Sequence, residues 1–360
     1  MAMTLQFRHG RPETLETLHP AHFALVMATA IVARTASLHN VEYVPDILLY
    51  LNIVFIVTLT AASVLRMARY PKAFAADIRS HGRGVGFFTV VAGFGVFGAQ
   101  LIFQRNAVHL ASAIWSLAIV LWLVITYGEL AVLTCTPEKP SIEQGLNGGW
   151  LVVVVATQSL SILTCLVQQA DPLAGLREPL MFAALALWLG GGALYLWLMT
   201  LIFYRYTFVR MSPEDLTPPY WINMGAVAIS TLAGATLLQH ASLSPTIQEL
   251  SIFIKGLTLA YWSIGTWWIP MLLVLGVWRY LIIGVPFAYD PLYWGGVFPL
   301  GMYSVCTFAL AQVLGAPFLY PVSSAFMVLA LIAWTVTFAG MVDSFLHARA
   351  SEAVGKGEPQ

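Results

Sequence analysis

The stretch Tyr293-Trp294-Gly295-Gly296-Val297-Phe298-Pro299-Leu300-Gly301 decides how this chain is interpreted. It lies in an apolar segment long enough to cross a bilayer, yet a helix used only as an anchor carries Leu, Ile and Val at such positions. Pro299 has no N–H and frees a carbonyl about one turn earlier, which predicts a kink. Gly295 and Gly301 remove side-chain bulk around Phe298. A bulky ring on a small-residue face is typical of a plug in a narrow pore; the alternative is close helix packing through glycines.

Composition places the chain in a membrane. Of 360 residues, 59% are hydrophobic and 9% are charged, and the mean hydropathy is +0.79. A soluble domain carries about 25% charged residues, so most of this chain cannot face water. The fold class that follows is an all-α polytopic membrane protein. A net charge of zero gives no reason to expect a nucleic-acid partner.

Hydropathy predicts ten transmembrane helices joined by short connections. Residues 1–19 form a polar segment without the apolar run of a cleavable signal, residues 20–347 form the membrane domain, and residues 348–360 are expected to be disordered. Lys and Arg gather on the side of both termini, which predicts a multi-pass protein of the cell (inner or plasma) membrane with both termini in the cytoplasm. The predicted spans are 20–39, 45–67, 84–104, 107–134, 147–169, 177–204, 218–240, 250–281, 289–315 and 321–347.

Odd and even spans differ in composition. Even spans carry tryptophans such as Trp188 and Trp268, whereas odd spans carry Gly, Ser and Thr. In the fifth span, Thr157, Ser161 and Thr164 recur at helical spacing and share one face. We therefore predict an inner ring of odd helices around a polar axis, although polar residues that link packed helices give a similar pattern. Odd spans begin about every 65–70 residues, which indicates an internal repeat of five helical hairpins.

Four short motifs add to this layout: Trp294 to Pro299 on span nine, Phe23-Ala24-Leu25-Val26-Met27-Ala28-Thr29 on span one, Pro218-Pro219-Tyr220-Trp221 at the start of span seven, and Trp268-Ile269-Pro270 in span eight. With its ten spans and five hairpins, the chain resembles the slow-type anion channel family. That family also includes tellurite-resistance membrane proteins and C4-dicarboxylate (malate) transporters. The resemblance covers nearly the whole chain as layout, and the span-nine motif is its most specific part.

The resemblance implies a homotrimer embedded in membrane lipid, in which the five odd helices of each protomer form a pore plugged by Phe298. It implies that small anions pass with few fixed charges along the way. Span one departs from the dicarboxylate branch, because Met27-Ala28-Thr29-Ala30 stands where that branch tends to have Met-Gly-Thr-Gly. The two added methyl groups are expected to narrow the pore. We expect helix kinks at Pro299 and Pro270. The residues expected to line the pore are Thr29, Thr89, Gly93, Thr157, Ser161, Asn223, Ser230, Gly295 and Gly301.

Two cations near the predicted outer ends of spans are candidates for attracting anions. Arg34 lies late in span one, and Lys255 lies early in span eight. A cation inside a membrane segment is costly, so it is a functional candidate by default. The alternative, which we favour for Lys255, is a long side chain that reaches the interface. Arg34 shares a helix face with Ala30, whereas Thr29 lies about 140° away, so Arg34 and Thr29 are not both expected to face the pore centre.

We do not expect an enzyme. The eight histidines form no H-E-x-x-H or paired metal-ligand pattern, and no serine-nucleophile motif or phosphate-binding loop is present. We expect neither a metal nor another cofactor. Two functions stay open. A channel would pass small anions, inorganic ions or C4-dicarboxylates, through a pore gated by an aromatic side chain. A secondary transporter of the malate or tellurite-related type would couple a C4-dicarboxylate or similar anion to protons.

Overall fold

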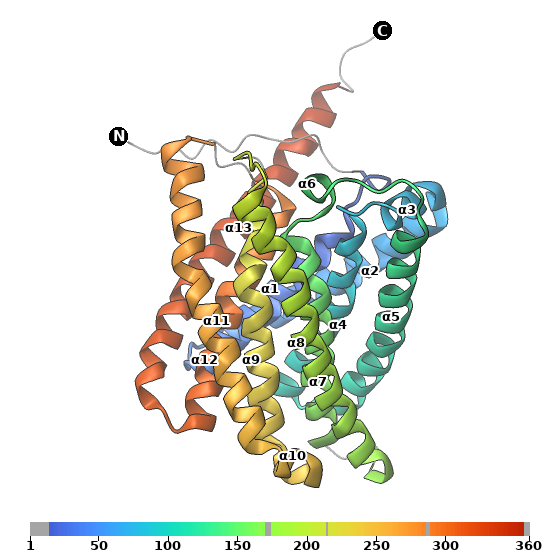
Figure 1. Cartoon of the computed structure of the whole chain (residues 1–360). Coiled ribbons are helices and arrows are strands. Elements are labelled where there is room, and N and C mark those ends of the chain that lie inside the picture. Colours follow the sequence, from blue (N-terminus) through green and yellow to red (C-terminus); the bar gives the residue numbers. More distant parts are fainter. Residues whose placement is uncertain (1–13, 170–173, 214, 286–288, 356–360) are drawn as a thin grey trace.

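The structure is a computed structural model that describes residues 14–169, 174–213, 215–285 and 289–355. Every regular element in these residues is helical. Ten of the helices are long and apolar enough to cross a membrane (Figure 1). The predicted fold class is therefore confirmed, and the ends of the predicted spans agree with the helices to within a few residues.

The spans form two sets that alternate along the chain. The odd spans contain α1 (Ala24–Leu38), α4 (Phe88–Arg105), α7 (Val152–Gln169), α9 (Ile222–Gln239) and α12 (Trp294–Leu314). The even spans contain α2 (Val44–Arg69), α5 (Val108–Cys135), α8 (Arg177–Phe208), α11 (Ser251–Val277) and α13 (Tyr320–Gly355). Short helices lie in the connections: α3 (Pro71–Ile78), α6 (Ile142–Gly145) and α10 (Pro245–Glu249).

The odd helices form a closed ring. α1 packs against α4 and α12, α4 packs against α7, and α9 packs against both α7 and α12. In the most apolar stretches of the odd spans, 72–94% of the residues are buried, against 11–39% in the even spans. We therefore call the odd helices inner and the even helices outer. Each outer helix packs mainly on the inner helix that precedes it: α2 on α1, α5 on α4, α8 on α7, α11 on α9 and α13 on α12.

Each inner helix begins with a 3-10 turn. The turns are η1 (Pro20–Phe23), η2 (Gly84–Phe87), η3 (Gly148–Leu151), η5 (Pro218–Trp221) and η8 (Pro291–Tyr293). They contact one another in the order η1, η2, η3, η5, η8 and back to η1. Proline opens η1, η5 and η8, a position where its missing N–H costs no intrahelical bond. Five helix N-termini thus meet at one end of the molecule, the end at which α6 is labelled in Figure 1.

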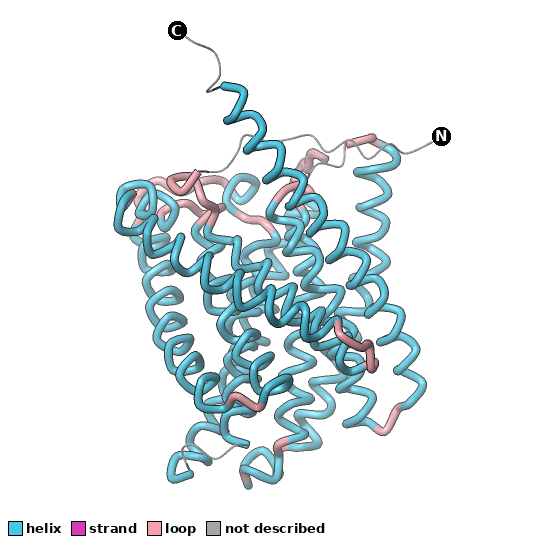
Figure 2. Tube along the Cα trace, turned by 180° about the vertical axis from the view of Figure 1, so that it is seen from behind, coloured by secondary structure: helices cyan, strands magenta, loops and turns pink. Residues whose placement is uncertain are grey.

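The last helix is longer than its span. Figure 2 shows α13 crossing the bundle obliquely and projecting beyond it. The helix ends at Gly355, whereas the part of it apolar enough to cross a membrane ends at His347. Residues 348–355, which were predicted to be disordered, are therefore helical. The rest of the predicted tail, residues 356–360, and residues 1–13 of the predicted N-terminal segment lie outside the described residues.

The ring of 3-10 turns yields a prediction about Gly148. A Cβ atom built on Gly148 would lie 2.5 Å from the carbonyl oxygen of Pro219, a backbone atom of η5 that has little freedom to move. We expect Gly148→Ala to lower the free energy of unfolding by about 1–3 kcal/mol. Thermal unfolding in detergent micelles measures the change. Gly256→Ala is the matched control, because a Cβ at Gly256 of α11 meets nothing within 4 Å. Equal stability of both variants would contradict the close approach of η3 and η5.

Candidate functional site

Two cavities lie inside the ring of inner helices. Cavity 1, of about 260 Å³, lies among the N-terminal ends of the inner helices, and cavity 2, of about 310 Å³, lies among their C-terminal halves. All five inner helices contribute residues to both cavities. The two cavities therefore lie along the axis of the ring, one toward each end.

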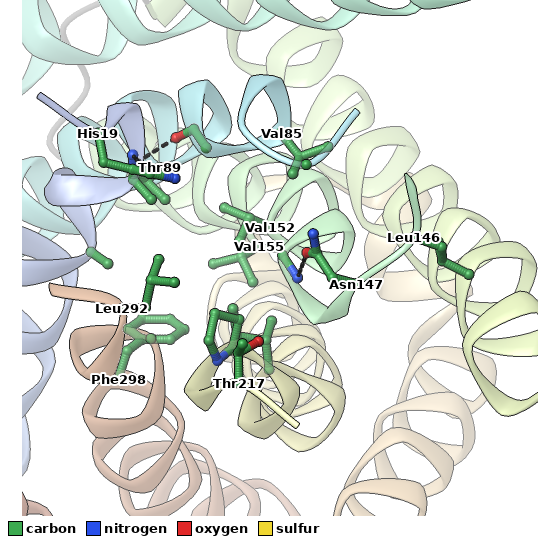
Figure 3. A pocket seen from close by; sticks show the side chains of 18 of the residues that line it. His19, Val85, Thr89, Leu146, Asn147, Val152, Val155, Thr217, Leu292 and Phe298 are labelled. Carbon is green, nitrogen blue, oxygen red and sulfur yellow. Dashed lines mark hydrogen bonds between the residues drawn. The ribbon is translucent and has the colours of Figure 1, made fainter. Parts of the chain in front are cut away.

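A thin layer of packed side chains separates the cavities. On α12, Phe298 lines cavity 1, and Met302, one turn later, lines cavity 2. On α7, the corresponding residues are Val155 and Ser159. Since a helix rises 1.5 Å per residue, the layer is about 6 Å thick along these helices. Phe298 and Met302 are each 1% exposed. Figure 3 shows the Phe298 ring extending from α12 beside Leu292.

The helices around this layer approach one another closely. A Cβ on Gly225 would lie 2.7 Å from Cγ of Pro299, and one on Gly301 would lie 2.9 Å from Cγ2 of Ile31. Glycine at these positions lets α12 pack closely against α9 and α1, so Gly301 is a packing contact and is not among the residues that line either cavity. α12 continues through Pro299, as α11 does through Pro270. A bend at either proline stays a prediction.

Cavity 1 contains an arginine that no sequence motif singled out. Arg205, near the end of α8, is 4% exposed and lines this cavity. Its guanidinium donates to the carbonyl of Leu146 at 2.7 Å and to the hydroxyl of Tyr220, and lies 3.4 Å from the carboxylate of Asp215. Nothing in the sequence around Arg205 indicates that it turns inward. Because Asp215 and Glu143 also line cavity 1, charges of both signs are present there.

Cavity 2 contains cationic and neutral polar groups. Arg34 lines it, and the guanidinium carbon of Arg34 lies 3.7 Å from the centre of the Phe103 ring. Among the described residues that line this cavity there is no Asp or Glu. Lys255 lies elsewhere: it is exposed on α11, close in sequence to Ile252, which is 89% exposed. Of the two cations predicted to attract anions, the structure places Arg34 alone at a cavity.

Several polar residues that were predicted to line the pore face the outer helices instead. Oγ1 of Thr29 accepts a hydrogen bond from Nε1 of Trp334 at 3.0 Å, and Oγ1 of Thr157 accepts one from Nε1 of Trp122 at 3.0 Å. The Ser161 hydroxyl donates to a backbone carbonyl of α8 at 2.8 Å. These bonds exist because a buried indole N–H or hydroxyl in a membrane segment needs a protein partner.

The remaining predicted lining residues divide between the cavities and the helix contacts. Nδ2 of Asn223 donates to the hydroxyl of Tyr206 on α8 at 2.8 Å, and the Ser230 carbonyl accepts a bond from Nε1 of Trp188 at 2.8 Å. Gly93 packs against the Phe23 side chain. Of the nine residues predicted to line the pore, cavity 1 is lined by Thr89 and Gly295, and neither cavity is lined by Thr29, Gly93, Thr157, Ser161, Asn223, Ser230 or Gly301.

Hydrogen bonds join each outer helix to the inner helix that follows it around the ring. In four cases the donor is an indole: Trp122 of α5 to α7, Trp188 of α8 to α9, Trp262 of α11 to Thr307 of α12 at 2.9 Å, and Trp334 of α13 to α1. In the fifth case, Nδ2 of Asn52 on α2 donates to Oε1 of Gln100 on α4 at 2.8 Å. The five bonds thus connect consecutive hairpins around the whole ring.

Ten membrane spans around two solute-sized cavities on one axis are typical of membrane transporters and channels, and the protein belongs to this class. Residues 17–342 match the family described as voltage-dependent anion channel. The chain belongs to this family, a family of membrane transporters and channels of anions.

Relatives agree with this assignment. An uncharacterized membrane protein of Mycobacterium tuberculosis is 34% identical over 170 residues, which cover 46% of this chain and 86% of that protein. Two uncharacterized transporters of Methanocaldococcus jannaschii are 25% identical over 333 residues and 23% identical over 309 residues. These alignments cover 90% and 83% of this chain, and 93% and 85% of the two transporters. The family and these names point to a transporter or channel and not to an enzyme.

The outward direction of Thr157 yields a second prediction. Thr157→Val removes the acceptor of the Trp122 N–H and leaves the donor of this half-buried indole unpaired within a membrane span, so we expect it to lower the free energy of unfolding by about 1–3 kcal/mol. Anion flux per folded molecule should stay unchanged, because Thr157 lines neither cavity. Thr200→Val is the control, since the exposed Thr200 hydroxyl bonds only within α8. A change in flux without a loss of stability would place Thr157 in the anion path.

Proposed function

We propose that the chain conducts small anions along the axis of the inner ring and that the side chain of Phe298 closes this path. The observation that carries the proposal is the layer between cavity 1 and cavity 2, one turn thick along α7 and α12, with Phe298 on one side of it and Met302 on the other. Both cavities are large enough for a small anion with some water, since each water molecule takes about 30 Å³. Only the layer interrupts the path between them.

The charge distribution supports anions as the conducted species. The N-termini of five inner helices surround cavity 1, and each helix N-terminus carries a partial positive charge of about +0.5. Arg34 lines cavity 2 at the other end. An anion is therefore attracted at both ends of the axis and meets its barrier at the apolar layer between them.

The composition of the layer favours a channel over a proton-coupled carrier. The residues on its two faces include Phe298, Met302, Met27, Ala30, Val155 and Ser159, and none of them titrates near neutral pH. A carrier that couples a carboxylate to protons needs a titratable group close to the point where substrate passes. In the described residues, the charged side chains of cavity 1, such as Arg205, come from the outer helices and connections around it.

Replacing Phe298 tests the proposal. Phe298→Ala should raise anion flux into liposomes under an imposed potential, and Phe298→Leu should raise it less because Leu keeps part of the volume. Removing a packed phenylalanine also costs about 3–5 kcal/mol of stability, so flux is normalised to folded protein and the melting temperature is measured alongside. The assay compares chloride, nitrate, sulfite, malate and succinate.

Phe88→Ala is the matched control for this experiment. Phe88 is 2% exposed on α4 and lines neither cavity, so its loss should lower stability without opening the layer. Higher flux in Phe298→Ala but not in Phe88→Ala supports the gate. Unchanged flux per folded molecule in both Phe298 variants would contradict the proposal that Phe298 closes the path. In that case, pH-dependent uptake of a dicarboxylate would favour a coupled carrier.

We further propose that the end bearing cavity 1 faces the cytoplasm and that both termini lie on that side, because Lys and Arg gather there in the sequence. Glu138 and Gln248 are exposed at opposite ends of the bundle. In a Cys135→Ser background, which removes the exposed native thiol, Gln248→Cys should react with a membrane-impermeant maleimide added to intact cells. Glu138→Cys should react only after the cells are opened. Labelling of both positions from outside would contradict this orientation.

A further inference from the structure

One link between the outer and inner helices leaves a donor unused. Asn52 of α2 is fully buried and donates from Nδ2 to Oε1 of Gln100 at 2.8 Å. Gln100 is 3% exposed and lines cavity 2, and its amide nitrogen has no hydrogen-bond partner among the described residues. A buried donor without a partner is costly and is rare in native proteins. This amide group therefore indicates a place for a ligand.

Arg34 brings a second donor to the same wall of cavity 2. Its guanidinium lies over the ring of Phe103, 3.7 Å from the ring centre. Phe103 follows Gln100 by three residues on α4, so the two side chains share a helix face and lie one turn apart. The Gln100 amide and the guanidinium stacked on Phe103 therefore lie along one face of α4, and Arg34, Gln100 and Phe103 all line the cavity.

The charge in cavity 2 indicates which ligand fits. Among the described residues that line it, Arg34 carries the only fixed charge. His240 also lines the cavity, with Nδ1 2.8 Å from the carbonyl oxygen of Thr236, and burial lowers the pKa of its imidazole. Its Nε2 lies 3.0 Å from Oε1 of Gln169, so both ring nitrogens already have protein partners. The cavity thus presents one positive charge, which matches a monovalent anion and leaves the second charge of a dicarboxylate unpaired.

We propose that cavity 2 holds a binding site for one small monovalent anion, with Gln100 and Arg34 as donors and Asn52 as a positioning residue. The bond from Asn52 occupies the carbonyl oxygen of the Gln100 amide, so the NH₂ group is the end left without a protein partner. Hydrogen bonds in which one partner is charged are the stronger ones, so both donors favour an anion over a neutral solute. The site rests on the proposed function, because it would hold an anion next to the layer that Phe298 closes.

Nitrate binding to the purified full-length protein tests the site directly. A ligand that binds only the folded protein raises Tm with its concentration, so Tm is followed against sodium nitrate, with sodium gluconate keeping the ionic strength constant. We expect Gln100→Met and Arg34→Gln each to raise the apparent Kd for nitrate about tenfold or more. Gln248→Met is the control, because Gln248 is exposed on α10 and lines neither cavity. Its Kd should stay within about twofold of the wild-type value.

The positioning role of Asn52 is tested by combining variants. Asn52→Leu should weaken nitrate binding about as much as Gln100→Met, and the double variant should bind no more weakly than either, because both changes remove the same oriented amide. A purely structural role of Asn52 predicts a lower Tm in gluconate with an unchanged Kd for nitrate. That result would remove Asn52 from the site.

Two results would overturn the site, and both are distinguishable from a failure of the proposed function. The first is a wild-type Kd for nitrate in both Gln100→Met and Arg34→Gln. The second is succinate binding tighter than nitrate, which would contradict the single positive charge. If Phe298→Ala raises anion flux while Gln100→Met leaves the Kd for nitrate unchanged, the results support the gate and contradict the binding site. If Gln100→Met raises the Kd for nitrate while Phe298→Ala conducts no anion, the results support the binding site and contradict the conduction proposal.

Discussion

The hydrogen bonds of the outer tryptophans constrain the arrangement of the whole bundle. Inside a bilayer no water satisfies a polar group, so each buried indole N–H needs an acceptor on a neighbouring helix. Trp122 finds Thr157, and Trp334 finds Thr29, each at 3.0 Å. Every such bond runs from one hairpin to the next, so the bonds that satisfy the outer helices also join the ring. Several polar groups of the inner helices, such as the hydroxyls of Thr29 and Thr157, are thereby used on the outer side of the ring.

An apolar axis follows from this arrangement. With hydroxyls such as those of Thr29 and Thr157 directed outward, mainly apolar residues such as Val155, Phe298 and Met302 face the axis between the cavities. An anion that leaves water for a dry apolar layer loses its hydration without gaining a partner, which is a large cost. A layer about 6 Å thick can therefore close the path with no charged gate. In the proposed mechanism, the volume of Phe298 sets this barrier.

The sequence predicted the spans well because a bilayer imposes a length and a hydropathy on every helix that crosses it. Helical periodicity also separated Arg34 from Thr29, and the structure places Arg34 at cavity 2 and Thr29 against an outer helix. Periodicity identifies a shared face but not its direction, so Thr157 and Ser161 were assigned to the pore although they face outer helices. The tryptophans of the even spans carried the missing signal, because a buried indole N–H requires an acceptor. The inward turn of Arg205 depends on contacts with Leu146 and Tyr220 that no local pattern encodes.

The hydrogen bond that joins α2 to α4 connects two amides, whereas the other four bonds between hairpins have indole donors. This difference changes the groups available beside cavity 2. In an indole link such as Trp122 to Thr157, the hydroxyl accepts one bond and donates its own hydrogen to the Val153 carbonyl at 2.8 Å, so no donor is left over. Two amides carry more donors and acceptors than a single bond uses. The bond between Asn52 and Gln100 therefore leaves an amide NH₂ beside cavity 2. The indole link from Trp122 leaves no donor over, whereas the link between two amides leaves a donor on the face of α4 that also carries Phe103 under Arg34.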